Sequence, residues 1–286
     1  MDIIGILGAG TMGAGIAQVA ASHGHNVVLY DVQAPLAQRG LDRIMQSLER
    51  AVQKQKIDRA AQEATLAHLW TTTDLADMSA TTIVIEAVPE DLALKRDLFR
   101  ALDHLCCDET ILCSNTSSLS IAALGGATQR ADRVAGLHFF NPAPVMPLIE
   151  VVRGDLTSDG TISRLIDLAR RWGKTPVLVK DTPGFIVNRV ARPFYGEALR
   201  LLDQGVADVE TIDRIARAAG FKMGPFELLD LIGLDVNLAV TQSIYQAYFH
   251  ESRFRPVTGQ QRRVDANRLG RKTGRGFYDY PAEPQS

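Results

Sequence analysis

A histidine and a glutamate are the two side chains of this sequence whose types and spacing best suit acid–base chemistry. His138 ends one apolar run, and Glu150 lies in a second apolar run twelve residues later, with a proline-rich loop between them. Two strands joined by that loop could bring the side chains together. A histidine held by a carboxylate is a suitable general base near neutral pH, because small changes in its surroundings move its protonation through that range. The alternative is a core histidine whose ring is satisfied by a backbone carbonyl.

A glycine-rich turn near the start of the sequence has the spacing that binds a dinucleotide. It follows an apolar run directly, precedes a run of small apolar residues, and fits the pattern G-x-G-x-x-G with Gly8, Ala9, Gly10, Thr11, Met12 and Gly13. The first glycine permits the tight turn, the second lets a pyrophosphate approach the backbone, and the third lets helix and strand pack closely. This context predicts a dinucleotide site, and the alternative is a turn that binds nothing.

A single carboxylate indicates which dinucleotide would bind. Asp31 closes the second expected strand, eighteen residues after Gly13, and no arginine follows it directly. A carboxylate at this point can accept hydrogen bonds from both ribose hydroxyls and repels a 2'-phosphate. The sequence therefore predicts NAD rather than NADP as the cofactor.

Strands and helices alternate through the first 182 residues, which predicts an α/β domain with a mostly parallel sheet. The apolar run 83–88 predicts a buried parallel strand, followed by a helix at 92–105. Glu90 then lies at the carboxyl end of a strand, where open α/β sheets bind ligands. Lys95 lies near the start of the helix, where it either meets a ligand's phosphate or carboxylate or is simply exposed.

Two further segments of this domain are candidates for ligand contacts. Residues 114–120 form a hydroxyl-rich cluster after a short strand, and such a cluster either caps a helix or binds a ligand. Residues 36–69 have a helical period over a length greater than an ordinary crossover. The exposed side of this helical insertion carries Lys54 and two further basic residues. It could reach over a ligand, and the alternative is a solvated helical face.

The alternation of strand and helix stops near Pro183, and the remaining sequence has a helical period. We therefore expect one domain at residues 1–182 and a helical domain at residues 183–286. Its helices are expected at 187–202, 209–219 and 225–248, with breaks at Gly205, Gly220 and Gly233. The first of these helices carries Asn188. The apolar content between residues 228 and 244 exceeds what a domain of this size needs to bury, so a homodimer through this domain is expected.

The overall composition limits the classes of partner and compartment. The chain has 286 residues, a formal net charge of -2 and a pI of about 6.3, so nothing indicates nucleic acid or an anionic membrane surface as a partner. The longest apolar runs are too short to span a bilayer, and no targeting signal precedes the first strand. The three cysteines match no metal spacing. We expect a cytoplasmic protein without a metal.

Seven segments, spread over nearly the whole chain, resemble a known family. They read GAGTMGAGIA, IEAVPED, SNTSSLSI, GLHFFNPAPVMPLIEV, DTPGFIVNR, GPFELLDLIGLD and KTGRGFY. In this order they resemble the L-3-hydroxyacyl-CoA dehydrogenases, in particular the short bacterial type often called 3-hydroxybutyryl-CoA dehydrogenase. The resemblance implies a Rossmann-type NAD domain followed by an all-α domain that dimerises.

The resemblance also implies roles for individual residues. It makes His138 the base and Glu150 its partner, with Ser117 and Asn188 contacting the substrate oxygen at the reacting carbon. It implies contacts with coenzyme A at Ser47, Lys54 and Ser117. It implies that the glycine-rich loop lies under the pyrophosphate of NAD and that the other NAD contacts are Asp31, Glu90, Lys95, Ser117, Asn141 and Lys272.

The implied reaction is the reversible, NAD-dependent oxidation of an L-3-hydroxyacyl-CoA to a 3-ketoacyl-CoA. Two alternatives remain open. The first is a dehydrogenase of a sugar acid such as L-gulonate, which would have no use for the basic residues around Lys54. The second is an NAD-binding sensor or structural protein without catalytic activity, which would need neither His138 nor Glu150.

Overall fold

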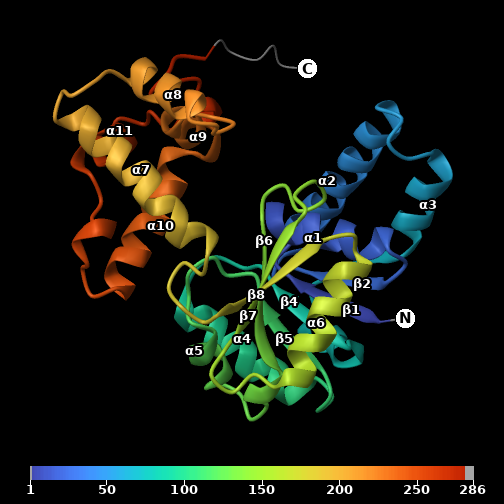
Figure 1. Ribbon diagram of the computed structural model, residues 1–286. Coiled ribbons are helices and arrows are strands. Elements are labelled where there is room, and N and C mark those ends of the chain that lie inside the picture. Colours follow the sequence, from blue (N-terminus) through green and yellow to red (C-terminus); the bar gives the residue numbers. More distant parts are fainter. Residues whose placement is uncertain (1, 281–286) are drawn as a thin grey trace. The chain divides into compact units, whose positions relative to one another are not determined.

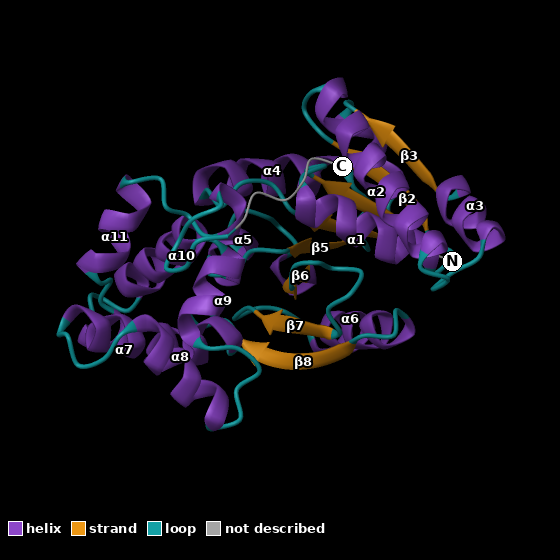
Figure 2. Ribbon diagram, turned by 90° about the horizontal axis from the view of Figure 1, so that it is seen from above, coloured by secondary structure: helices purple, strands orange, loops and turns teal. Residues whose placement is uncertain are grey.

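The protein consists of two compact units. Figures 1 and 2 show a computed structural model, which describes residues 2–280. The chain divides into residues 1–182, called unit 1, and residues 183–286, called unit 2. Unit 1 contains an eight-stranded sheet with its helices, and the elements of unit 2 are helices. The predicted fold class, a mostly parallel α/β domain followed by an all-α domain, is confirmed.

The sheet of unit 1 has the strand order β3-β2-β1-β4-β5-β6-β7-β8. Neighbouring strands are parallel except β6 and β7, which are antiparallel. The order reverses between β1 and β4, and open α/β sheets bind ligands at such a switch point. The strands are β1 (Ile3–Leu7), β2 (Asn26–Tyr30), β3 (Leu69–Thr72), β4 (Ile83–Glu86), β5 (Ile111–Ser114), β6 (Val134–Phe139), β7 (Leu148–Arg153) and β8 (Thr175–Lys180).

The helices of unit 1 bury apolar faces against this sheet. Ile16 of α1 and Leu165 of α6 belong to the same buried core cluster as Ile6 of β1 and Ile85 of β4. All four residues of β4 are buried, as expected of a strand covered on both faces. The helices are α1 (Thr11–Ser22), α2 (Ala34–Gln53), α3 (Arg59–Ala67), α4 (Leu92–Leu105), α5 (Ile121–Gly125) and α6 (Asp159–Arg171).

The helical insertion differs from the prediction at its C-terminal end. Two helices, α2 and α3, pack against each other (Figure 1), and the Asp58 side chain caps α3 by accepting from the Ala61 N–H at 2.7 Å. Leu69, which was predicted to end the helical segment, instead begins the edge strand β3. That part of the prediction was wrong because a strand of four residues is too short to show a period of its own.

Unit 2 folds around one core of aromatic and aliphatic side chains, which includes Tyr195, Leu199, Phe226 and Leu229. The expected breaks occur after α7, after α8 and between α9 and α10, where the three predicted glycines have positive φ angles. Across residues 2–280, no helix has the length and apolar character that crossing a bilayer requires. The helices of this unit are α7 (Val187–Asp203), α8 (Val209–Ala218), α9 (Pro225–Ile232), α10 (Leu234–Ala247) and α11 (Thr258–Asp265).

Candidate active site

Several residues that were predicted to take part in the chemistry lie at one edge of the sheet in unit 1. The carboxyl ends of β1, β4, β5 and β6 lie at this edge, because these strands are parallel to one another. The loop Gly8–Gly13 follows β1, Glu86 ends β4, and His138 lies one residue before the end of β6. Asn115, which follows β5, accepts a hydrogen bond from the Phe139 N–H at 2.8 Å and joins the ends of β5 and β6. The predicted dinucleotide loop and the predicted acid–base pair therefore share one edge.

The antiparallel pairing of β6 and β7 brings His138 and Glu150 together. The two residues are direct register partners, and opposite residues of an antiparallel pair project to the same face of the sheet. Nδ1 of His138 lies 2.7 Å from Oε2 of Glu150, and the two residues are 6% and 1% exposed. The ring of Phe140 packs against the imidazole with 4.5 Å between centroids. The carboxylate therefore fixes the plane of the imidazole.

This contact also determines which nitrogen of the imidazole is basic. A carboxylate that accepts from Nδ1 keeps the proton of the neutral ring on that nitrogen. Nε2 of His138 is then the nitrogen that can take up a second proton. The negative charge of Glu150 stabilises the imidazolium that results, because both groups are removed from water. The pair can act as a base in one direction and as an acid in the other.

Of the three glycines in the glycine-rich loop, Gly10 is the one that has open space beside it. A Cβ atom on Gly8 would lie 2.7 Å from the Ala87 carbonyl oxygen, and one on Gly13 would lie 1.7 Å from the Gly8 oxygen. A Cβ atom on Gly10 would meet no atom of the chain within 4 Å. Gly10 is also the N-cap of α1, and no side chain caps this helix. Backbone N–H groups at such a helix end bind phosphate, so the loop fits a pyrophosphate at Gly10.

Asp31 is attached directly to this loop. Its Oδ2 atom accepts a hydrogen bond from the Ala9 N–H at 2.9 Å, which orients the carboxylate at the carboxyl end of β2. Arg43 of α2 donates from Nη1 to the Ala9 carbonyl oxygen at 3.3 Å. The sequence did not single out Arg43, because it lies twelve positions after Asp31. The structure thus places a carboxylate and a guanidinium on either side of Ala9.

A buried carboxylate that the sequence analysis missed lies at the end of β4. Glu86 is fully buried, and its Oε1 atom accepts from Lys95 Nζ at 2.6 Å and from the Val88 N–H at 2.7 Å. Its Oε2 atom accepts from Ser114 Oγ at 2.6 Å. The available signal was an acid inside an apolar strand, since such residues are almost never fully buried unless they are paired.

Lys95 connects this buried carboxylate to the edge of the sheet. It is 1% exposed, which excludes the alternative of a simply exposed lysine. Its Nζ atom also lies 3.2 Å from Oε2 of Glu90, whose side chain is 38% exposed. Oε1 of Glu90 in turn accepts from the Ser117 N–H at 3.0 Å and from Thr116 Oγ1. The network therefore holds Glu90 and Ser117 side by side, with Lys95 behind them.

Removing the buried carboxylate should be costly. We expect Glu86→Ala to lower the free energy of unfolding by about 3–5 kcal/mol, because the Lys95 ammonium would keep only the half-exposed Glu90 as a charged partner, beside the Val88 carbonyl oxygen. Urea denaturation measures the change. The double variant Glu86→Ala/Lys95→Met also removes the ammonium of Lys95 that has lost this partner, so it should recover part of the lost free energy of unfolding. A loss below about 1 kcal/mol in the single variant would contradict this role of the buried pair.

The remaining predicted contacts of unit 1 lie on α2 and on the β6–β7 loop. Ser47 and Lys54 are seven residues, or about two turns, apart and therefore lie on the same side of α2. Ser47 is half-buried, and Lys54 is exposed at the C-cap. Asn141 is exposed at the start of the loop that joins the two strands of the acid–base pair. The structure gives each of these side chains a position on the surface of unit 1.

Two predicted contacts lie in unit 2. Asn188 occupies the first turn of α7. Lys272 lies in a 3-10 turn, and its Nζ atom pairs with Asp235 of α10 at 2.6 Å. Residues 2–280 contain no group of three or more histidine, cysteine or acidic side chains that could hold a metal ion.

Two family models match the chain in succession. The model described as the NAD-binding domain of 3-hydroxyacyl-CoA dehydrogenase matches residues 3–182. The model described as the C-terminal domain of 3-hydroxyacyl-CoA dehydrogenase matches residues 184–280. Together they cover nearly the whole sequence in the order that the motifs indicated.

Similar proteins carry related names. The chain is 50% identical over 287 residues to a 3-hydroxyadipyl-CoA dehydrogenase of Escherichia coli K12, covering 100% of this chain and 60% of that longer protein. It is 42% identical over 278 residues to a 3-hydroxybutyryl-CoA dehydrogenase of Clostridioides difficile, covering 97% and 99% of the two chains. The crystal structure of (S)-3-hydroxybutyryl-CoA dehydrogenase from Ralstonia eutropha superposes with a TM-score of 0.93 at 42% identity, covering 98% and 99%. The chain therefore belongs to the 3-hydroxyacyl-CoA dehydrogenase family of NAD-dependent oxidoreductases.

Proposed function

We propose that this protein oxidises an L-3-hydroxyacyl-CoA to the 3-ketoacyl-CoA, with His138 as the base and Glu150 as its partner. The observation that carries the proposal is the buried contact of 2.7 Å between Nδ1 of His138 and Glu150, at the sheet edge that also bears the dinucleotide loop. A protein that only bound NAD would need no buried acid–base pair at that edge. The family relation supports the reaction class.

In the proposed mechanism, His138 takes up the proton of the substrate's C3 hydroxyl. Nε2 accepts the proton of the C3 hydroxyl while C3 is oxidised, and Glu150 stabilises the imidazolium that forms. The Gly8–Gly13 loop would hold NAD, which would supply the acceptor for the hydride from C3. In the reverse reaction the imidazolium returns its proton to the oxygen at C3. Positioned acid–base catalysis of this kind contributes roughly 100- to 10,000-fold to the rate.

Ser117 and Asn188 are the proposed contacts of the oxygen at C3. Hydrogen bonds from these side chains would orient that oxygen and stabilise negative charge on it during the reduction. The hydrogen bond between Glu90 and the Ser117 N–H holds the serine at the end of β5. For NAD, the geometry supports contacts at the Gly8–Gly13 loop, Asp31 and Glu90, while Lys95 would act through Glu90. Asn141 and Lys272 remain proposed contacts from the family pattern.

Ser47 and Lys54 are the proposed contacts of coenzyme A. Both lie on one side of α2, and Lys54 is exposed at the helix C-cap with Lys56 close by in sequence. A cationic, accessible face suits the phosphates of coenzyme A, and a small sugar acid would have no use for it. This observation favours the acyl-CoA substrate over the sugar acid.

A comparison of substrates tests the reaction class. The rate of NADH oxidation would be measured with acetoacetyl-CoA and longer 3-ketoacyl-CoA substrates, and NAD reduction with free L-gulonate and free 3-hydroxy acids. We expect turnover with the coenzyme A thioesters only. Turnover of the free acids alone would support the sugar-acid dehydrogenase, and no turnover at high protein concentration would support the non-catalytic alternative.

The cofactor preference can be tested at Asp31. We expect Asp31→Asn to reduce the ratio of kcat/KM for NADH over NADPH at least tenfold, because the amide no longer repels a 2'-phosphate, and Arg43 lies near enough to attract one. The amide oxygen can still accept from the Ala9 N–H, so the loop should keep its shape. Glu63→Ala, which removes an exposed carboxylate from α3, is the matched control. An unchanged ratio would show that Asp31 does not select the cofactor.

We also propose a homodimer through unit 2. Several large apolar side chains of this unit are at least 39% exposed, and they include Ile215, Phe221, Leu231, Ile232 and Val236. Large exposed apolar side chains mark a protein interface when they form one patch, and we propose that these side chains do so. Sedimentation velocity would detect the dimer, and a single monomeric species at micromolar concentration would contradict it.

A further inference from the structure

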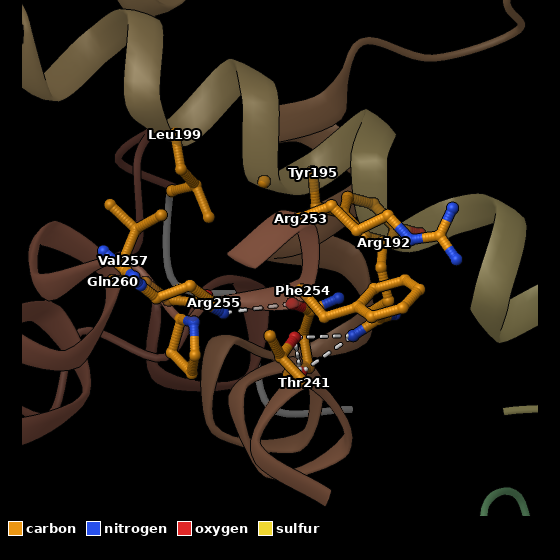
Figure 3. Close-up of a pocket in the computed structure, with 12 residues that line it drawn as sticks. Arg192, Tyr195, Leu199, Thr241, Arg253, Phe254, Arg255, Val257 and Gln260 are labelled. Atoms are coloured by element: carbon orange, nitrogen blue, oxygen red, sulfur yellow. Dashed lines mark hydrogen bonds between the residues drawn. The ribbon is translucent and has the colours of Figure 1, made fainter. Parts of the chain in front are cut away.

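A pocket within unit 2 contains a buried arginine that no carboxylate of the described residues 2–280 neutralises. The pocket lies among α7, α10, the residues before α11 and the first turn of α11 (Figure 3). Its polar lining residues include Arg192, Arg253, Arg255, Asn237, Thr241 and Gln260. No aspartate or glutamate is among the described residues that line it. Arg253 pairs with Glu251 outside the lining at 2.7 Å, so the positive charge of the pocket comes from Arg192 and Arg255.

Arg192 of α7 carries that charge in the interior. It is 5% exposed, and Nη1 donates to the Asn237 carbonyl oxygen at 3.0 Å and to Thr241 Oγ1 at 2.8 Å (Figure 3). Its guanidinium also lies over the ring of Tyr195, 4.9 Å from the centroid. Within residues 2–280, no acidic side chain forms an ion pair with it. Burial lowers the pKa of Arg192 to about 10, so the guanidinium still carries its charge at neutral pH.

Two buried donors of this pocket have no acceptor. They are Nε of Arg192 and Nδ2 of Asn237. The orientation of the Asn237 amide follows from Gln260, whose Nε2 atom donates to Asn237 Oδ1 and to the Leu234 carbonyl oxygen, each at 3.1 Å. A water molecule could accept from both donors, but it would leave the buried charge uncompensated, which is costly. An oxygen-bearing anion would satisfy both donors and the charge.

The position of Arg192 on its helix indicates where this anion belongs. Arg192 follows Asn188 by four residues, so the two side chains leave the same face of α7, about 6 Å apart along the helix axis. Asn188 is the proposed contact of the oxygen at C3. A carboxylate three carbons beyond C3 lies at a comparable distance along an extended acyl chain.

We propose that Arg192 and Asn237 bind a carboxylate at the far end of the substrate's acyl chain. The preferred substrate is then a dicarboxylyl-CoA rather than a fatty acyl-CoA that ends in a methyl group. The inference rests on the proposed function, because Asn188 and C3 set the position from which the carboxylate is reached. The pocket would then decide whether the protein prefers an acyl chain that ends in a carboxylate or one that ends in a methyl group.

Two substrates of equal length test the proposal. They are the coenzyme A thioesters of 3-hydroxyadipate and 3-hydroxyhexanoate, which differ only in a terminal carboxylate or methyl group. With saturating NAD, we expect the wild-type kcat/KM to be at least tenfold higher for the dicarboxylyl thioester. In Arg192→Met this ratio should fall at least tenfold, mainly through KM. Arg214→Met, at an exposed arginine of α8 outside the pocket, is the matched control and should keep the wild-type ratio.

A second variant covers the case in which Arg192→Met does not fold. Asn237→Asp places a carboxylate beside Arg192, so it supplies an internal counter-ion and should melt at or above the wild-type temperature. Its side chain would occupy the acceptor position and repel the substrate's carboxylate, so the same ratio should fall. A ratio that stays at the wild-type value in Asn237→Asp overturns the proposal.

The outcomes separate this inference from the proposed function. Wild-type activity on neither thioester would overturn the proposed function itself. The wild type could act on both thioesters with a ratio of kcat/KM near one, or Arg192→Met could lose activity equally on both. Either result would be consistent with the dehydrogenase activity but would leave Arg192 with a structural role only. The carboxylate site would then be rejected.

Discussion

His138→Gln should reduce kcat by about two to four orders of magnitude while the affinity for NADH stays within a few-fold of the wild-type value. Glutamine can keep a hydrogen bond to Glu150, but it cannot accept the proton of the C3 hydroxyl. The dinucleotide loop follows a different strand, so NADH binding should be preserved. Stopped-flow measurement of 3-ketoacyl-CoA reduction, together with fluorescence titration of NADH, gives the two quantities separately.

Glu150→Gln is the matched variant for this experiment. It preserves the shape of the side chain but removes the charge that would stabilise the imidazolium, so kcat should fall by a smaller factor than in His138→Gln. Because the two residues act as one unit, the double variant should lose little more than His138→Gln alone. Near-normal turnover in His138→Gln would remove the base from the mechanism, whatever the other variants show.

Gly10→Val should weaken NADH binding by about 10- to 100-fold, which corresponds to roughly 1.4–2.8 kcal/mol, and leave the stability of the protein unchanged. The new side chain meets no atom of the protein within 4 Å at its Cβ position, and the backbone φ of −67° suits any residue. It would, however, fill the space in which the pyrophosphate approaches the helix N-terminus. Fluorescence titration and thermal denaturation measure the two effects.

Gly13→Val provides the contrasting variant. Its Cβ atom would lie 1.7 Å from the Gly8 carbonyl oxygen, so the loop must move, and both stability and NADH binding should fall. The pair of variants separates a glycine that the ligand requires from a glycine that the fold requires. If Gly10→Val binds NADH as tightly as the wild type, the pyrophosphate does not lie at this position.

The elements that carry the chemistry could be predicted from local patterns. A glycine-rich turn of this spacing, between an apolar strand and a helix, is typical of a dinucleotide site. The family resemblance, confirmed by the two family models, rests on long motifs in a fixed order. The strands of the acid–base pair were expected to meet because a short loop joins them. Their antiparallel register was not stated, yet it alone decides that His138 faces Glu150.

Other features depend on contacts between distant parts of the chain. The strand Leu69–Thr72 is too short to show a period, and it exists because β2 pairs with it. For Lys95 the sequence offered a ligand contact or simple exposure, but not the pairing with Glu86, because that pairing requires the packing of α4 against the end of β4. Arg192 showed no signal at all, since an arginine on a helix is usually solvated and only the tertiary packing of α7 on α10 buries it.

The antiparallel direction of β7 determines which insertions and deletions keep His138 and Glu150 together. His138 and Glu150 sit on adjacent strands of a hairpin, so residues could be added to or removed from the loop at its tip without separating them. A single residue inserted within either strand, between the paired residue and the loop, would instead turn one of the two side chains to the opposite face if the rest of the ladder kept its register. The pair therefore tolerates changes in the length of the loop. It does not tolerate a shift of one residue in the register of β6 and β7.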